Sequence, residues 1–156
     1  MYNQDCKEVA GDIIQLAIEG RFDVIVHGCN CFCTMGAGLA KAIRAEFPEA
    51  YKADLNTKKG DASKLGTYTK ATVDRNGNTI TIINAYIQFE YGWVGTMAQY
   101  EAIRNVCIKL KSEFSGKRFG FPLIGAGLAG GNWKIIEIIL CKELQGEDYT
   151  VVKLPT

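Results

Sequence analysis

The sequence predicts an α/β fold, a three-layer α/β/α sandwich around a mixed, mostly parallel central sheet. Short apolar and β-branched runs, typical of buried strands, alternate with segments whose apolar residues recur at helical spacing. Glycine-rich turns follow two of these runs and lead into predicted helices. At 156 residues, without repeats or linkers, we expect a single domain over residues 1–156.

The first part of the chain supplies a short helix, a buried strand and a longer helix. Asp12 is placed to cap a helix that runs through Ile18. Residues 22–27 form an apolar run that ends before a glycine, which is typical of a buried strand. Residues 36–47 carry apolar side chains at four-residue spacing, and Pro48 directly after them predicts that this helix stops there.

A polar loop and a hairpin follow in the middle of the chain. The loop covers residues 56–64, the most polar stretch of the sequence. Residues 67–73 and 79–85 are β-branched runs, and the segment between them contains an Asn-Gly pair. Such a pair is typical of a tight hairpin turn, so we expect these two strands to be antiparallel neighbours.

Two further helices and two further strands are predicted in the second half. Thr96 and Gln99 resemble a capping box at the start of an amphipathic helix. Residues 119–124 read as another buried strand. Asn132 is a suitable N-cap for the last helix, and residues 149–154 are expected to close the chain as a strand.

Glycine-rich loops follow the strands predicted at 22–27 and 119–124. The first loop leads through residues 36–38, and the second covers residues 125–131. Open α/β sheets bind ligands beyond the carboxyl ends of their strands. Glycine lets the main chain approach a ligand closely, and successive N–H groups beside a helix N-terminus form an anion cradle. The two loops therefore predict a pyrophosphate site, with plain strand-to-helix turns as the alternative.

The charge balance and the hydropathy exclude several classes of protein. Lys and Arg number 18, Asp and Glu number 17, and the net charge of +1 predicts no non-specific nucleic-acid binding. No run of 18 apolar residues occurs, so no membrane association is expected. The N-terminus is too polar for a signal peptide, which predicts a cytoplasmic protein with reduced thiols. No P-loop pattern occurs, and the third glycine of the dinucleotide-binding pattern is missing.

Three of the six cysteines, Cys29, Cys31 and Cys33, form a C-x-C-x-C pattern. On a strand these side chains would share one face, so a metal or redox site is an open alternative. The spacing of a four-ligand zinc site is absent, and His27 is the only histidine. We therefore expect no metal and no cofactor, and we interpret these cysteines as small residues that line a loop.

Four stretches then suggest a family: Gly11-Asp12-Ile13-Ile14, Val26-His27-Gly28-Cys29-Asn30-Cys31, Met35-Gly36-Ala37-Gly38-Leu39-Ala40 with Phe47-Pro48-Glu49-Ala50-Tyr51, and Ile124-Gly125-Ala126-Gly127-Leu128-Ala129-Gly130-Gly131. In order and spacing they resemble the macrodomain family of ADP-ribose-binding α/β/α modules, over residues 11–154. The third stretch is similar to the branch that contains ADP-ribose-1''-phosphate phosphatases and certain ADP-ribosyl hydrolases. The resemblance implies ADP-ribose or a derivative as ligand, and ADP-ribosylated macromolecules as partners.

The resemblance also implies roles for individual residues. Asp12 would accept a hydrogen bond from the adenine amino group, although a helix cap is its alternative role. Asn30 would bind hydroxyls of the distal ribose, with turn stabilisation as the alternative. The two glycine loops would hold the diphosphate between them. The implied ligand-binding residues are Asp12, Ile13, Cys29, Met35, Gly36, Ala37, Gly38, Leu39, Gly125, Ala126, Gly127, Leu128 and Ala129.

The candidates for catalysis are His27, Asn30 and Asn132. The imidazole of His27 would act as a general acid or base, or else be a buried group bonded to the main chain. Cys29 as a nucleophile is disfavoured against a lining role. In many similar sequences an acidic residue stands where this chain has Ala129 and Asn132, and a neutral amide is no general base. We expect hydrolysis of an ADP-ribose derivative, with a non-catalytic ADP-ribose-binding module as the alternative.

Overall fold

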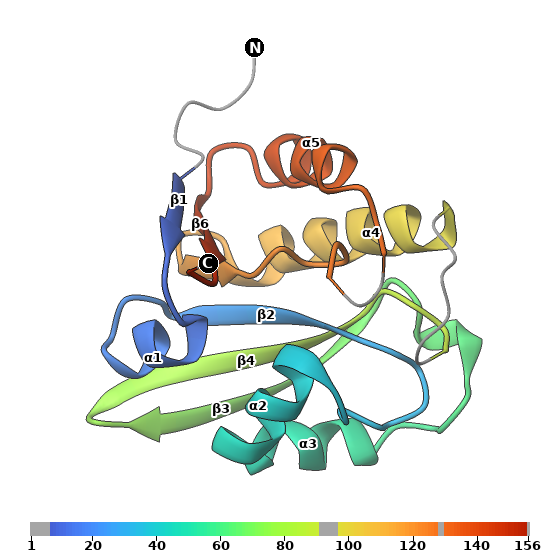
Figure 1. Cartoon of the computed structure of the whole chain (residues 1–156), viewed down its shortest axis with the longest axis horizontal. Coiled ribbons are helices and arrows are strands. Elements are labelled where there is room, and N and C mark those ends of the chain that lie inside the picture. Colours follow the sequence, from blue (N-terminus) through green and yellow to red (C-terminus); the bar gives the residue numbers. More distant parts are fainter. Residues whose placement is uncertain (1–6, 91–96, 128–129, 156) are drawn as a thin grey trace.

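The structure is a computed structural model of the chain, and it describes residues 7–90, 97–127 and 130–155. Six strands form one sheet in the order β1-β6-β5-β2-β4-β3 (Figure 1). Their bounds are β1 Lys7–Ala10, β2 Val24–Cys29, β3 Tyr68–Arg75, β4 Asn78–Tyr86, β5 Arg118–Phe121 and β6 Asp148–Lys153. Every neighbouring pair is parallel except β3 and β4, which form an antiparallel hairpin.

Helices cover both faces of this sheet, as Figure 1 shows. Their bounds are α1 Ile13–Ile18, α2 Gly38–Glu46, α3 Pro48–Leu55, α4 Met97–Phe114 and α5 Trp133–Glu143, with a 3-10 turn η1 at Ala62–Lys64. Helices α4 and α5 pack on one face over an apolar cluster that includes Phe119 and Tyr149. Helices α1, α2 and α3 pack on the other face over a second cluster around Ile25 and Phe47. The predicted three-layer sandwich with a mixed, mostly parallel sheet is confirmed.

The hairpin turn and the start of the last helix agree with the predictions made from the sequence. Asn76 and Gly77 both have positive φ angles, 53° and 78°, in the turn between β3 and β4. Two successive residues with positive φ form the tight turn that joins antiparallel strands. Asn and Gly adopt this conformation readily, so an Asn-Gly pair predicts such a turn. The side chain of Asn132 caps α5 by accepting a hydrogen bond from the Lys134 N–H group at 2.9 Å.

Strand β1 and helix α3 are not predicted by the sequence, and several predicted boundaries differ by one to three residues. Strand β1 is an exposed edge strand, so it lacks the apolar run by which buried strands are recognised. Pro48 ends α2, but it also occupies the first turn of α3, where a missing N–H group costs nothing. The strand predicted at 119–124 ends at Phe121, because Pro122 cannot donate to the sheet. Among the described residues, no helix has the length and apolar character needed to cross a membrane.

Close packing between β5 and the chain entering β2 leads to a stability prediction. A Cβ atom at Gly120 would lie 2.7 Å from Cδ2 of Phe22, whose ring is 6% exposed and has little room to move. Replacing Gly120 by Ala should lower the free energy of unfolding by about 1–3 kcal/mol, the usual cost of overpacking. Urea unfolding measures this. Gly127→Ala is the control, because its Cβ atom would meet nothing within 4 Å; equal midpoints for both variants would contradict the packing argument.

Candidate ligand-binding site

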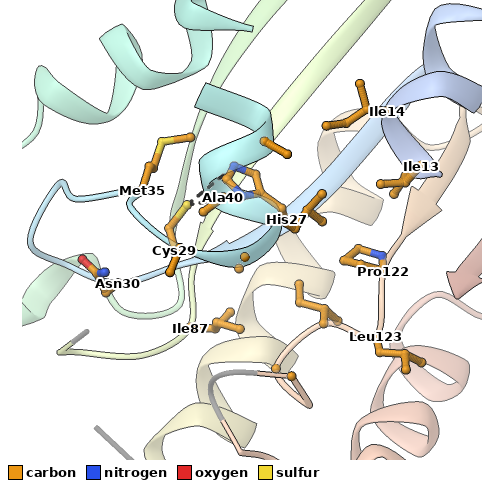
Figure 2. Close-up of a pocket in the computed structure, with 18 of the residues that line it drawn as sticks. Ile13, Ile14, His27, Cys29, Asn30, Met35, Ala40, Ile87, Pro122 and Leu123 are labelled. Atoms are coloured by element: carbon orange, nitrogen blue, oxygen red, sulfur yellow. Dashed lines mark hydrogen bonds between the residues drawn. The ribbon is translucent and has the colours of Figure 1, made fainter. Parts of the chain in front are cut away.

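A cavity of about 900 Å³ opens where the parallel strands end. Its wall contains the carboxyl end of β2, the residues that follow β4 and β5, and the end of β6. Figure 2 shows Ile13 and Ile14 on one side, Asn30 and Met35 on the other, and His27 between them. The cavity therefore lies at the edge of the sheet where the two glycine loops meet.

The loop between β2 and α2 is held in place by its own polar side chains. Oδ1 of Asn30 accepts a hydrogen bond from the Phe32 N–H group at 2.7 Å, and Nδ2 donates to Oγ1 of Thr34 at 2.7 Å. Cys33 and Met35 have positive φ angles of 57° and 42°, a backbone conformation that residues other than glycine adopt rarely. Asn30 therefore fills the turn-stabilising role that the sequence left open, and it also lines the cavity.

The start of α2 borders the cavity. Ala37 is the N-cap, and among the described residues no side chain caps this helix. The N–H groups of a first helical turn have no partner within the helix, and the helix dipole places partial positive charge there. Residues 36–40 line the cavity. The arrangement provides donors for an anionic group without a charged side chain.

The second glycine loop is fixed by a buried amide from α4. Nε2 of Gln99 donates to the Gly125 carbonyl at 2.8 Å, and the Gly131 N–H group donates to the same oxygen at 2.7 Å. Gly125 has a φ of 77°, and a Cβ atom at Gly131 would lie 2.5 Å from that carbonyl. Both positions therefore require glycine. The sequence assigned Gln99 to a capping box with Thr96; Thr96 lies outside the described residues, and the Gln99 amide holds this loop.

The opposite end of the cavity is formed by the start of α1. Oδ1 of Asp12 accepts hydrogen bonds from the N–H groups of Ile14 at 2.9 Å and Gln15 at 3.4 Å, so Asp12 caps this helix. Asp12 is exposed and contributes to the cavity wall together with Ile13 and Ile14. A cap uses one carboxylate oxygen, so capping and ligand recognition are compatible at this residue.

His27 lies in β2 at the base of the cavity and is 2% exposed. Burial lowers the pKa of its imidazole to about 4, and the hydrogen bond with Asn84 offsets this only in part. The Asn84 amide donates to the Ala50 carbonyl, so its Oδ1 faces Nε2 of His27 at 2.7 Å and accepts from it. The neutral ring is bonded to a side chain rather than to the main chain. Its Nδ1 atom is left without a proton.

The three clustered cysteines do not form the single-faced array that a strand would give. Only Cys29 belongs to β2, whereas Cys31 and Cys33 lie in the following loop. Burial raises the pKa of the Cys29 thiol well above its ordinary value, with a contribution from nearby Asp54. A protonated, buried thiol is a poor nucleophile, which agrees with a lining role. Among the described residues, no three His, Cys, Asp or Glu side chains are arranged to hold a metal ion.

The structure brings most of the proposed site residues to this cavity. Those that line it are Asp12, Ile13, His27, Cys29, Asn30, Met35, Gly36, Ala37, Gly38, Leu39, Gly125 and Gly127. Ala126 does not line it, and Leu128 and Ala129 lie outside the described residues. Asn132 is exposed, is not among the described residues of this wall, and caps α5 with its side chain, so its catalytic role stays a prediction.

Other wall residues carried no functional signal in the sequence. Gln88 and Ile87 follow β4, and Pro122 and Leu123 follow β5, where parallel strand ends meet. Asp54 also lines the cavity, from the last turn of α3. The sequence analysis did not predict α3, so no argument placed this carboxylate near the site.

Comparisons with known proteins agree on the fold and the family. The Macro domain family model matches residues 26–140. An uncharacterized 17.5 kDa protein from the tk-vs intergenic region of Enterobacteria phage T4 is 39% identical over 140 residues, which cover 86% of each chain. The macrodomain of Mycobacterium tuberculosis DarG is similar in structure, with a TM-score of 0.74, 18% identity, and coverage of 97% of this chain and 99% of that one.

A third similar structure is Thermosipho africanus DarTG in complex with ADP-ribose, with a TM-score of 0.71 and 17% identity. The alignment covers 99% of this chain and 43% of the longer DarTG chain. At these TM-scores and identities, the similarity to the two solved structures shows a shared fold. The chain belongs to the Macro domain family.

The capping role of Asn132 leads to a prediction about stability and binding. Asn132→Ala should lower the free energy of unfolding by about 1 kcal/mol, because the Lys134 N–H group loses its acceptor. Asn132→Asp should retain the cap and the stability. Neither change should alter ligand affinity, since the side chain does not line the cavity. Chemical denaturation and calorimetry measure the two effects; a large loss of affinity in Asn132→Ala would place this residue in the site after all.

Burial of the single histidine predicts a pH dependence. An unfolded histidine titrates near 6.5, whereas the pKa of folded His27 is about 4, so the unfolded chain binds more protons between these values. The contribution of His27 to stability should be complete above about pH 6.5 and lost as pH falls through 4, about 3 kcal/mol in total. Its ring resonances in NMR should stay those of neutral imidazole from pH 5.5 to 8.

His27→Gln is the control for this prediction. The variant should flatten the dependence of unfolding free energy on pH in the window from 4 to 6.5, because it removes the titrating group. A ring that titrates within one pH unit of 6.5 in the folded protein would show that His27 is accessible to protons and solvent.

Proposed function

We propose that the cavity binds ADP-ribose or an ADP-ribose derivative. The observation that carries this proposal is the pair of glycine loops that border one cavity at the carboxyl ends of the strands, one of them leading into the uncapped start of α2. Such loops suit a diphosphate, since they supply several donors without excess positive charge. The volume of about 900 Å³ is within the range of nucleotide-sized ligand sites. Membership of the Macro domain family, and the ADP-ribose complex of Thermosipho africanus DarTG, support the same ligand.

The two ends of the cavity assign an orientation to this ligand. The adenine lies against Ile13 and Ile14, where the carboxylate of Asp12 accepts a hydrogen bond from the exocyclic amino group. The diphosphate lies between the start of α2 and the loop after β5. The terminal ribose then lies beside Asn30, on the side of the cavity opposite to Ile13 and Ile14.

Hydrolysis at the terminal ribose is the finer proposal for this site. It would release either phosphate from ADP-ribose-1''-phosphate or an ADP-ribosyl adduct, with the cavity positioning the substrate. Nδ1 of His27 is the basic atom at the base of the cavity, because the other ring nitrogen donates to Asn84. A non-catalytic binding module is the second candidate. It is favoured by the protonated Cys29 thiol and by the commitment of Asn132 to a helix cap.

Incubation of the purified protein with both substrate types distinguishes these two candidates. Turnover no greater than that of buffer alone, with a known active hydrolase as positive control, would reject hydrolysis and leave the binding module. Release of phosphate alone would identify a phosphatase, whereas release of ADP-ribose from an adduct alone would identify an ADP-ribosyl hydrolase.

Two glycines on opposite walls test the binding proposal. Gly36→Val and Gly127→Val should each weaken ADP-ribose binding about tenfold or more, because the added side chain separates the ligand from main-chain donors. Both variants should fold, since a Cβ atom meets only the Thr34 carbonyl at 3.8 Å in the first case and nothing within 4 Å in the second. Calorimetry measures affinity, and thermal unfolding checks the fold. Wild-type protein that binds no ADP-ribose would overturn the proposed function.

A further inference from the structure

A cysteine and a lysine side chain are in contact in the corner of the fold beside the cavity. Cys33 lies in the loop between β2 and α2, and Lys64 is the last residue of the 3-10 turn η1. Nζ of Lys64 lies 3.7 Å from Sγ of Cys33, although the two residues are 31 positions apart in the sequence. Neither is among the described residues of the cavity wall, so the proposed ligand binding does not use this pair.

The end of the Lys64 side chain is buried and held beside the sulfur. Lys64 is 8% exposed, and its Nζ atom donates to Oγ1 of Thr57 at 2.8 Å and lies 5.0 Å from the centre of the Tyr86 ring. Within the described parts of the chain, no carboxylate forms a salt bridge with it. The nitrogen is therefore positioned by uncharged groups that keep it next to Sγ of Cys33.

Cys33 is the most accessible thiol of the C-x-C-x-C stretch. Cys29 is 5% exposed and Cys31 is 0% exposed, whereas Cys33 is only partly buried. Thiols that solvent can reach are oxidised before buried ones. Sγ of Cys33 donates to the Asp54 carbonyl at 3.2 Å, so the sulfur is the acceptor in its contact with Lys64. An oxidant that reaches this corner therefore meets a sulfur atom with an amine beside it.

We propose that Cys33 and Lys64 form a redox modification site, at which hydrogen peroxide produces a sulfenamide link between Sγ and Nζ. The Cys33 thiol first attacks the peroxide: the O–O bond breaks, the sulfur becomes a sulfenic acid, and one water leaves. The Lys64 ammonium group loses a proton to solvent, and the resulting amine attacks that sulfur. An N–S bond forms, the S–O bond breaks, and the hydroxyl leaves with an amine proton as a second water.

This reaction is balanced without any further reactant. The sulfur is oxidised by two electrons, and the peroxide is reduced by two electrons to water. Sulfenic acids condense in the same way with a nearby thiol or main-chain nitrogen, and the Lys64 amine supplies the nitrogen here. Two thiols of an added reductant reverse the link: they become a disulfide, and the S–N bond is reduced to the original thiol and amine.

The link joins the loop that carries Asn30 and Met35 to the turn η1. It closes a segment between two residues 31 positions apart, and such a cross-link restricts the unfolded chain as a disulfide does. The oxidised protein should therefore unfold at a temperature about 5–10 °C higher than the reduced protein. Addition of a thiol reductant should return the unfolding temperature to its original value.

The test treats the reduced, purified chain with hydrogen peroxide and maps the products by mass spectrometry without reductant. The expected product has lost two hydrogen atoms. Trypsin should not cleave after Lys64, and the peptide that contains Lys64 should stay joined to the peptide that contains Cys33. Cys31→Ser is the matched control and should form the same link. Lys64→Met should form no link, and its Cys33 should continue to sulfinic acid.

Several results would overturn the proposal. A disulfide between Cys31 and Cys33 has the same mass loss, but it lies within one tryptic peptide and leaves Lys64 free for cleavage. Oxidation of wild-type Cys33 to sulfinic acid without a cross-link, or a link to Lys59 instead, would equally contradict it. If Lys64→Met does not fold, the peptide map of the wild type decides alone, because fragmentation of the joined peptides identifies both linked residues.

Discussion

The site depends on one hydrogen-bond constraint: the Gly125 carbonyl is held at once by the Gln99 amide and by the Gly131 N–H group. This pair of bonds folds the loop after β5 back on itself and directs its backbone to the cavity. The buried amide comes from α4, which packs on the core of one sheet face. The shape of this loop is therefore set by tertiary packing, although the groups it offers in the proposed function are main-chain groups that every residue possesses.

A second polar network stabilises the floor of the same cavity from the opposite sheet face. His27 bonds to Asn84, and Asn84 in turn donates to the Ala50 carbonyl at the start of α3. Tyr86, two residues further along β4, donates to Asp54 at the other end of α3. Both ends of this helix are thus tied to β4 by buried hydrogen bonds. Because such bonds are directional, they fix where α3 places its carboxylate relative to the strand ends.

The fold and the location of the site could be predicted from the sequence because they depend on patterns that are local. Apolar runs, the Asn-Gly turn and the glycine loops each report on a few neighbouring residues. Strand β1 and helix α3 could not be predicted in this way. The first gains its partner only from β6 at the far end of the chain, and the second begins at a proline that also ends α2. Asp54 was missed with α3, since its burial results from contacts with residues distant in sequence.

The same distinction explains why short polar side chains were ambiguous. Asp12, Asn30 and Asn132 were each proposed to meet a ligand, and each forms a hydrogen bond with a main-chain N–H group two residues ahead. Asp and Asn are favoured at helix starts and turns for this local bond, and ligand sites are built from the same helix starts. The residue type alone cannot separate these two roles. The structure separates the local role by showing which main-chain N–H group each of these three side chains bonds.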